Sequence, residues 1–252
     1  MLNTDVIMLG WWRTAEEIGY YSADQRIVGI LYTLPSIVAS SIFPHLSKLI
    51  KQNEKEKIKA LNEKSIASTF FIAIPLVIGG VILAQPLIKF VFGQEYIPAA
   101  GAFKILILTT LLTFSGTITS NLIMAHNQQK RIFYFVVLGA LGNVVLNALF
   151  IPLYGINGAA VATVTSQSIY YGLMWRHIKK IDNFFTLRYL KKPILSAIIM
   201  GGFSFVLNKM GLNVVINIIF SAGIYLGILY LLKEQTLLEI ISWAKKFPLK
   251  QS

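Results

Sequence analysis

The stretch GYYSADQRIVGILYTLPSIVASSIFPHLSK, residues 19–48, decides the fold class. It carries no charge between Arg26 and His45, and residues 27–46 are long enough for a helix to cross a hydrocarbon core of about 30 Å. A lysine-rich segment, residues 48–64, follows this apolar run. The pattern predicts a membrane-spanning helix with a basic downstream end.

Composition extends this prediction to the whole chain. Hydrophobic residues make up 55% of it, charged residues 13%, and the mean hydropathy is +0.64, which is too apolar for an ordinary soluble domain. Long continuous apolar runs favour helices over the short alternating segments of an outer-membrane barrel. We therefore predict an all-α, polytopic membrane helix bundle. The basic residues lie in loops between apolar runs, and this disfavours nucleic-acid binding.

Seven apolar runs are separated by polar segments. The runs are residues 27–46, 66–92, 102–125, 133–151, 158–175, 193–207 and 214–232. The second contains Pro75, Gly79, Gly80 and Pro86, which predict a bend. Residues 2–12 are too few to cross a bilayer and are typical of a helix whose beginning lies outside the chain.

Most of the 23 lysines and arginines lie in alternate loops. These loops are residues 47–65, 126–131, 176–192 and the tail 233–252. Short basic loops stay on the cytoplasmic side, so residue 1 is expected near the outer face and residue 252 in the cytoplasm. In the tail, Leu237, Ile241 and Ala244 share one helical face, which predicts a helix lying in the membrane interface.

Sequence patterns for catalysis are absent from the chain. There is no DxD pair, no HExxH box and no Ser/His/Asp grouping, and without cysteine there is no thiolate metal site. We therefore expect neither an enzyme nor a cofactor or metal centre. The informative residues are instead polar side chains inside the apolar runs, because such groups usually face a cavity or a partner helix.

Eight such residues are candidates for a substrate-binding cavity. Asp24 and Arg26 precede the first span, where Arg26 either binds a phosphate-bearing headgroup or reaches the lipid headgroups and pairs with Asp24. Asn143 and Asn147 lie one turn apart on the fourth span, where interhelical hydrogen bonding is the simpler interpretation. The other four form a stripe on the fifth span that could line a hydrophilic path, although small residues opposite it also favour tight packing. They are Thr163, Ser166, Gln167 and Tyr170.

Motifs spread over roughly residues 4–180 resemble the Wzx-type oligosaccharide flippases. This polysaccharide transporter family belongs to the MOP exporter superfamily, with the lipid II flippase and the MATE drug exporters. The motifs are DVIMLG at 5–10, GYYSADQR at 19–26, FPHLS at 43–47, VFGQEY at 91–96, IMAHNQQK at 123–130 and YGINGAAVAT at 154–163.

The resemblance implies two six-helix bundles around a central cavity, sometimes with two extra helices. This chain resembles the second, MATE-like bundle, residues 1–180, followed by two additional transmembrane helices in 181–232 and the cytoplasmic tail 233–252. It implies export of a polyprenyl-diphosphate-linked oligosaccharide, for O-antigen or polysaccharide, from the inner to the outer leaflet of the plasma (inner) membrane by alternating access. A cavity arginine in the lipid II flippase lies in a Tyr-Ala-Asp-Arg setting, and Arg26 occupies the similar place here after an extra Gln25.

A single bundle supplies only one wall of that cavity. Transport would therefore require a missing N-terminal half, a second copy or other glycan-assembly proteins as partners, besides membrane lipids. Two alternatives stay open: an inactive fragment or interaction subunit without transport of its own, and a multidrug exporter of the MATE kind. An enzyme of glycan assembly would need a catalytic set that the chain does not contain.

Overall fold

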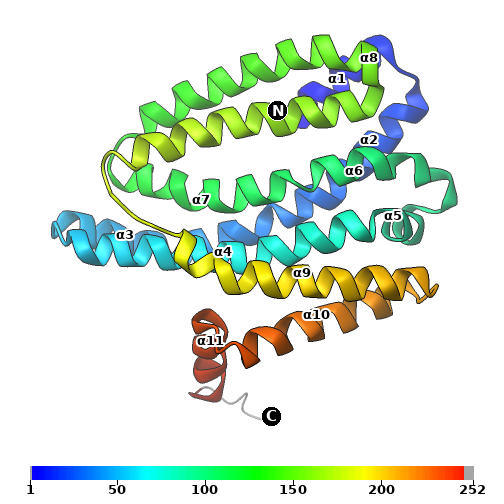
Figure 1. Cartoon of the computed structure of the whole chain (residues 1–252). Coiled ribbons are helices and arrows are strands. Elements are labelled where there is room, and N and C mark those ends of the chain that lie inside the picture. Colours follow the sequence, from blue (N-terminus) through cyan, green and yellow to red (C-terminus); the bar gives the residue numbers. More distant parts are fainter. Residues whose placement is uncertain (1, 247–252) are drawn as a thin grey trace, which may run out of the picture.

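The computed structural model describes residues 2–246, and this part of the chain is helical, without strands (Figure 1). The α-helices are α1 (Leu2–Trp12), α2 (Ala15–Leu31), α3 (Thr33–Lys51), α4 (Lys55–Ile82), α5 (Ala84–Phe92), α6 (Ala100–Leu106), α7 (Thr109–Ala125), α8 (Gln129–Ile178), α9 (Leu187–Lys209), α10 (Val214–Leu231) and α11 (Gln235–Lys246). A 3-10 helix, η1 (Gln94–Ala99), precedes α6. The predicted all-α membrane bundle is confirmed.

Among the described residues, five helical stretches are long and apolar enough to span a membrane, or six if the bent pair Gln94–Leu106 and Thr109–Ala125 counts as one. Helix α8 contains both the fourth and the fifth predicted spans. It turns back on itself at Gly155, whose φ of 57° and ψ of −136° are not helical (Figure 1). The two arms of α8 therefore form a hairpin.

Helices α2 and α3 form one stretch of 37 residues, Ala15–Lys51, that is about 55 Å long. The side chain of Thr14 caps its start by accepting a hydrogen bond from the backbone N–H of Glu17. The helix thus begins twelve residues before the predicted span, so Asp24 and Arg26 lie within it rather than ahead of it. It is interrupted at Tyr32, because Pro35 offers no N–H to the carbonyl one turn earlier.

Two further interruptions shape the bundle. Helix α4 ends at Ile82 and α5 begins at Ala84, just before Pro86, so the bend predicted for residues 66–92 lies there. Figure 1 shows α4 along the page and α5 nearly end-on. Between α6 and α7 the chain bends by 43°, and the N–H of Thr110 bonds the carbonyl of Ile107 in a tight i to i−3 turn.

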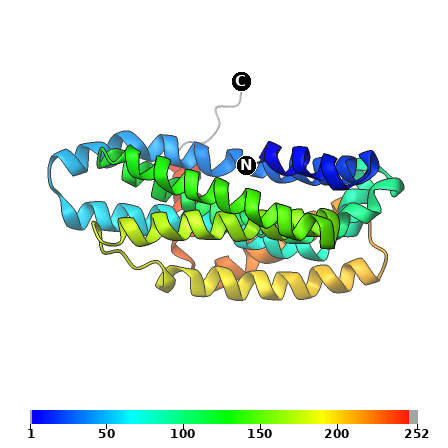
Figure 2. The ribbon, with the colours of Figure 1, turned by 90° about the horizontal axis from the view of Figure 1, so that it is seen from above.

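Helices α9 and α10 pack together beside α4, on the side of the bundle away from α2 and α3 (Figure 2). Asn217 on α10 is fully buried, and its side-chain oxygen accepts hydrogen bonds from Ser204 at 3.1 Å and Ser221 at 3.0 Å. The hydroxyl of Tyr225 donates to the backbone carbonyl of Phe71 on α4 at 2.8 Å. This pair of helices is therefore joined to the bundle by specific polar contacts as well as by apolar packing.

Helix α11 covers the end of α10. Leu237 is buried against the cluster that contains Phe71 and Tyr225, and Ile241 packs against the same cluster. Lys64 and Glu239 form an ion pair at 2.5 Å. Leu237 and Ile241 of the predicted interfacial face therefore contact the bundle, whereas the side chain of Ala244 and all of residues 247–252 lie outside the described part.

Candidate functional site

A carboxylate is buried among polar side chains of three helices. Asp5, on α1, has no exposed surface. It accepts hydrogen bonds from the hydroxyls of Tyr21 on α2 at 2.9 Å and Thr163 on α8 at 2.7 Å, and from the side-chain amide of Asn147 on α8 at 2.6 Å. One carboxylate thus joins three helices.

Asn143 lies next to these residues. We call Asp5, Tyr21, Asn143, Asn147 and Thr163 the Asp5 cluster. The amide of Asn147 also lies 3.1 Å from the side-chain oxygen of Asn143. The remaining polar atoms, Asn143 Nδ2 and Asn147 Oδ1, are buried without a hydrogen-bond partner among the described residues. The cluster therefore keeps free donor and acceptor capacity at a place shielded from lipid.

The hairpin of α8 creates the cluster, because it brings Asn147 on the outgoing arm and Thr163 on the returning arm to one carboxylate. Arg13, in the link between α1 and α2, holds the turn of the hairpin. Its guanidinium donates to the backbone carbonyls of Ile151 at 2.7 Å and Pro152 at 2.9 Å, close to the turn at Gly155.

The chemistry of the Asp5 cluster follows from its burial. An anion buried in a protein is costly unless it is paired, and here the hydrogen-bond partners of the carboxylate are neutral. Carboxylate, amide and hydroxyl oxygens are also the ligand types that hard cations take. The cluster therefore gathers carboxylate, amide and hydroxyl oxygens at one buried point.

A second polar group lies where α2 meets α3. The hydroxyl of Tyr32 lies 2.5 Å from that of Thr109 at the start of α7, and the side chains of Thr113 and Gln167 neighbour the same phenol. Tyr171, on the returning arm of α8, lies against Thr113 and Gly116. We call Tyr32, Thr109, Thr113, Gln167 and Tyr171 the hydroxyl cluster.

The structure distributes the predicted stripe of the fifth span over both groups. Thr163 joins the Asp5 cluster and Gln167 the hydroxyl cluster. Ser166 bonds within its own helix, to the carbonyl of Thr163 at 3.1 Å, and the ring of Tyr170 stacks on Tyr171 with centroids 3.9 Å apart. The stripe therefore faces helices α1, α2 and α7 rather than an open channel.

Asp24 and Arg26 do not form the ion pair that was one expectation. Asp24 has no exposed surface, and neither of its carboxylate oxygens has a hydrogen-bond partner among the described residues. Arg26 is exposed. Residues two apart on a helix point to different sides, so this pairing fails once the helix begins at Ala15.

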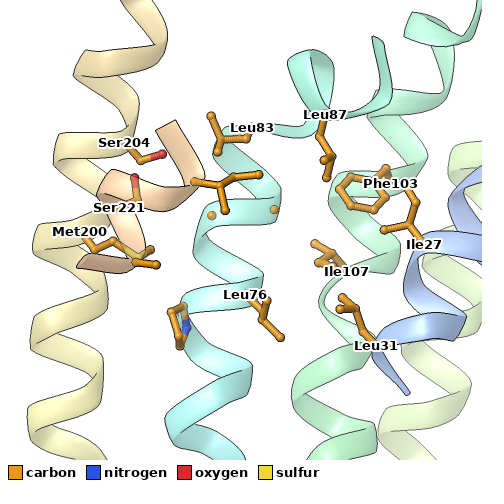
Figure 3. Close-up of a pocket in the computed structure, with 15 residues that line it drawn as sticks. Ile27, Leu31, Leu76, Leu83, Leu87, Phe103, Ile107, Met200, Ser204 and Ser221 are labelled. Carbon is orange, nitrogen blue, oxygen red and sulfur yellow. The ribbon is translucent and has the colours of Figure 1, made fainter. Parts of the chain in front are cut away.

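Next to Arg26 along α2, an apolar pocket of about 210 Å³ opens between six helices, α2, α4, α5, α6, α9 and α10 (Figure 3). Ile27 and Leu31 of α2 and Phe103 of α6 form one wall, and Met200 and Ser204 of α9 form part of the other. Gly79 and Gly80 of α4 also line the pocket and place no side chain in it. The pocket lies where α9 and α10 meet the rest of the bundle, and it suits a hydrocarbon chain.

Sequence reasoning missed Asp5, Tyr21 and the pocket. Asp5 was detectable, because a charge within an apolar run signals a buried polar site, but residues 2–12 were judged by their length alone. Tyr21 is recognisable only from its contact with Asp5. The pocket combines residues from six helices, and no local pattern encodes it.

A bundle of long apolar helices with buried polar clusters is typical of a multi-pass membrane protein. Comparison with known proteins specifies the family. Residues 19–230 match the family described as "Lipid II flippase MurJ", and the chain belongs to it. The prediction named the Wzx branch, whereas the matching family is the related lipid II flippase branch of the same superfamily.

Similar proteins agree with this assignment. The chain is 28% identical over 230 residues to the "Probable low-salt glycan biosynthesis flippase Agl15" of Haloferax volcanii, covering 89% of this chain and 48% of that protein. It is 24% identical over 149 residues, 59% of this chain and 35% of the other, to a "Putative O-antigen transporter" of Shigella flexneri. The structure "Lipid II flippase MurJ, inward closed conformation" superposes with a TM-score of 0.75 at 21% identity, over 89% of this chain and 49% of that one. The chain thus spans between about a third and a half of the length of these relatives.

Proposed function

We propose that the chain forms half of a transporter that moves a polyprenyl-diphosphate-linked oligosaccharide from the inner to the outer leaflet of the plasma membrane by alternating access. The observation that carries this proposal is the adjacency of Arg26 and Ile27 on α2. Arg26 is exposed, whereas Ile27 and Leu31 line the apolar pocket. A diphosphate next to a long hydrocarbon chain is the chemistry that this adjacency fits.

Residues 1–180 would supply the second wall of a central cavity. Residues 181–232 would add two helices whose role is to form the far side of the pocket, and the tail 233–252 would lie in the cytoplasm. The oligosaccharide would be of the O-antigen or polysaccharide kind, as in the Wzx branch. Asp24 and the polar residues of α8 would contribute to the cavity when the helices rearrange.

The experiment compares Arg26→Ala, Arg26→Lys and the control Arg176→Ala in cells that depend on the complete transporter. Losing a charge-assisted hydrogen bond costs about 1.5–3 kcal/mol, so Arg26→Ala should reduce surface glycan roughly tenfold or more. Arg26→Lys should retain part of the activity, and Arg176→Ala, exposed near the end of α8, should retain all of it. Unchanged surface glycan in Arg26→Ala would show that Arg26 does not bind the headgroup.

The second candidate is an inactive fragment or interaction subunit without transport of its own. Deleting the gene separates the possibilities. Loss of surface glycan supports the flippase, unchanged glycan supports the fragment, and a change in drug resistance alone supports a MATE-like exporter.

A further inference from the structure

The apolar pocket and the hydroxyl cluster meet at two helix interruptions. Leu31 lines the pocket and directly precedes Tyr32, where α2 gives way to α3. Ile107 lines the pocket and lies two residues before Thr109, where α6 gives way to α7. Figure 3 shows Leu31 and Ile107 close together on one wall. An occupant of the pocket would therefore contact side chains next to both interruptions.

A chain of two hydrogen bonds joins these interruptions. The hydroxyl of Thr109 donates to the carbonyl of Leu106 at 2.5 Å, which compensates for the helical bond missing at the bend. The hydroxyl of Tyr32 then donates to that of Thr109, also at 2.5 Å. Its other neighbours, Thr113 and Gln167, belong to α7 and α8. The phenol of Tyr32 thus lies between the bend and the returning arm of α8, next to Gln167, whose side-chain oxygen has no hydrogen-bond partner among the described residues.

We propose that the hydrogen bond between Tyr32 and Thr109 transmits the filling of the apolar pocket to the hydroxyl cluster, through a change in the bend between α6 and α7. The identification of the natural occupant as a polyprenyl chain rests on the proposed function. Ile107 moves when the pocket fills, the start of α7 follows, and Tyr32 carries the displacement to Gln167. A change of about 5° at the bend would move the far end of α7 by about 2 Å.

The first test needs no lipid, because Gly80 supplies a substitute for the occupant. A Cβ at Gly80 would lie 3.0 Å from Cγ1 of Ile107, whereas a Cβ at Gly79 would meet nothing within 4 Å. Gly80→Ala therefore presses on Ile107, and Gly79→Ala is the matched control. The chain has no cysteine, so spin labels can be placed at Lys104→Cys on α6 and Met124→Cys on α7, both exposed. We expect this label distance to shift by about 2 Å in Gly80→Ala and to stay unchanged in Gly79→Ala.

A second label pair, Ile30→Cys on α2 and Ile169→Cys on α8, reports transmission at two exposed positions. With Gly80→Ala present, this distance should also shift. Tyr32→Phe should abolish the second shift and leave the first, whereas Thr109→Ser, which keeps the hydroxyl, should preserve both. A general loss of stability would not remove the shift in the second label distance while leaving the shift in the first. A second shift that persists in Tyr32→Phe, or no first shift in Gly80→Ala, overturns the proposal.

The final test places the labelled chain in phosphatidylglycerol nanodiscs with and without polyprenyl phosphate. The lipid should reproduce both shifts seen in Gly80→Ala, and Tyr32→Phe should again remove only the second. If Gly80→Ala produces the shifts and the lipid does not, the link is supported and the proposed occupant is wrong. If the lipid shifts both distances in Tyr32→Phe as well, the link through Tyr32 is wrong and the proposed function is untouched.

Discussion

The carboxylate of Asp5 accepts a 2.7 Å hydrogen bond from the hydroxyl of Thr163, although the two residues are 158 positions apart in the chain. Asp5 lies on the short helix α1, and Thr163 on the returning arm of α8. No water is available in a hydrocarbon core to replace such a bond, so polar groups there must satisfy one another. The contact therefore fixes α1 against the α8 hairpin.

Replacing Asp5 by alanine should destabilise the folded chain. The substitution leaves the donors of Tyr21, Asn147 and Thr163 without their acceptor, and an unsatisfied buried group costs about 1–3 kcal/mol. We expect a lower free energy of unfolding in detergent for Asp5→Ala and little change for Glu56→Ala, an exposed acid on α4.

A double-mutant cycle that combines Asp5→Ala with Thr163→Val measures the coupling energy between Asp5 and Thr163. If the two side chains act together, the combined loss in Asp5→Ala with Thr163→Val will be smaller than the sum of the single losses. Strict additivity would contradict a direct coupling between them.

Gly155 should accept a side chain poorly, because its backbone lies in the left-handed region that favours glycine. Its φ is +57°, and an added Cβ would lie 3.1 Å from Oε1 of Glu17 and 3.4 Å from the guanidinium of Arg13. Gly155→Ala should lower the free energy of unfolding by about 1–3 kcal/mol, because it strains the turn of the hairpin. Gly142, on a regular arm of the same helix, has no neighbour within 4 Å, so Gly142→Ala should be neutral or slightly stabilising. Equal effects of the two substitutions on thermal unfolding would show that the turn is not constrained.

Gly116 makes room for Tyr171 of the hydroxyl cluster. A Cβ at Gly116 would lie 1.9 Å from the ring of Tyr171, so the ring must move in Gly116→Ala. Overpacking of this kind costs about 1–3 kcal/mol. Gly172→Ala, where nothing lies within 4 Å, is the matched control. Adding Tyr171→Ala should recover much of the loss in Gly116→Ala as measured by thermal unfolding, and a failure to recover would mean that another contact causes it.

Local sequence patterns predicted the helices but not the contacts between them. The length and polarity of each apolar run depend only on neighbouring residues, and these properties were enough to place the runs on either side of Gly155. The Asp5 cluster depends on how the arms of α8 fold back on α1, and a one-dimensional pattern does not contain that information. The Asp24 and Arg26 pairing is absent for a local reason: α2 begins at Ala15 with Glu16 and Glu17 in its first turn, so both residues lie inside a helix and point to different sides.

The orientation of the chain in the membrane is the last prediction. Figure 1 places the α3–α4 and α8–α9 connections at one end of the bundle, and η1 and the turn of the α8 hairpin at the other. The lysine-rich connections gather at the first end, which the positive-inside rule assigns to the cytoplasm. Reporter proteins fused after Lys55 and after Lys180 should therefore report the cytoplasm, and one fused after Gln94 the outside. Fusions are judged by paired activities, a phosphatase active only outside and a fluorescent protein active only inside. If Lys55 and Gln94 report the same side, α4 and α5 do not cross the membrane together. If all three fusions report the opposite side, the C-terminus lies outside. Arg26 would then lie nearer the inner face than the proposed function requires.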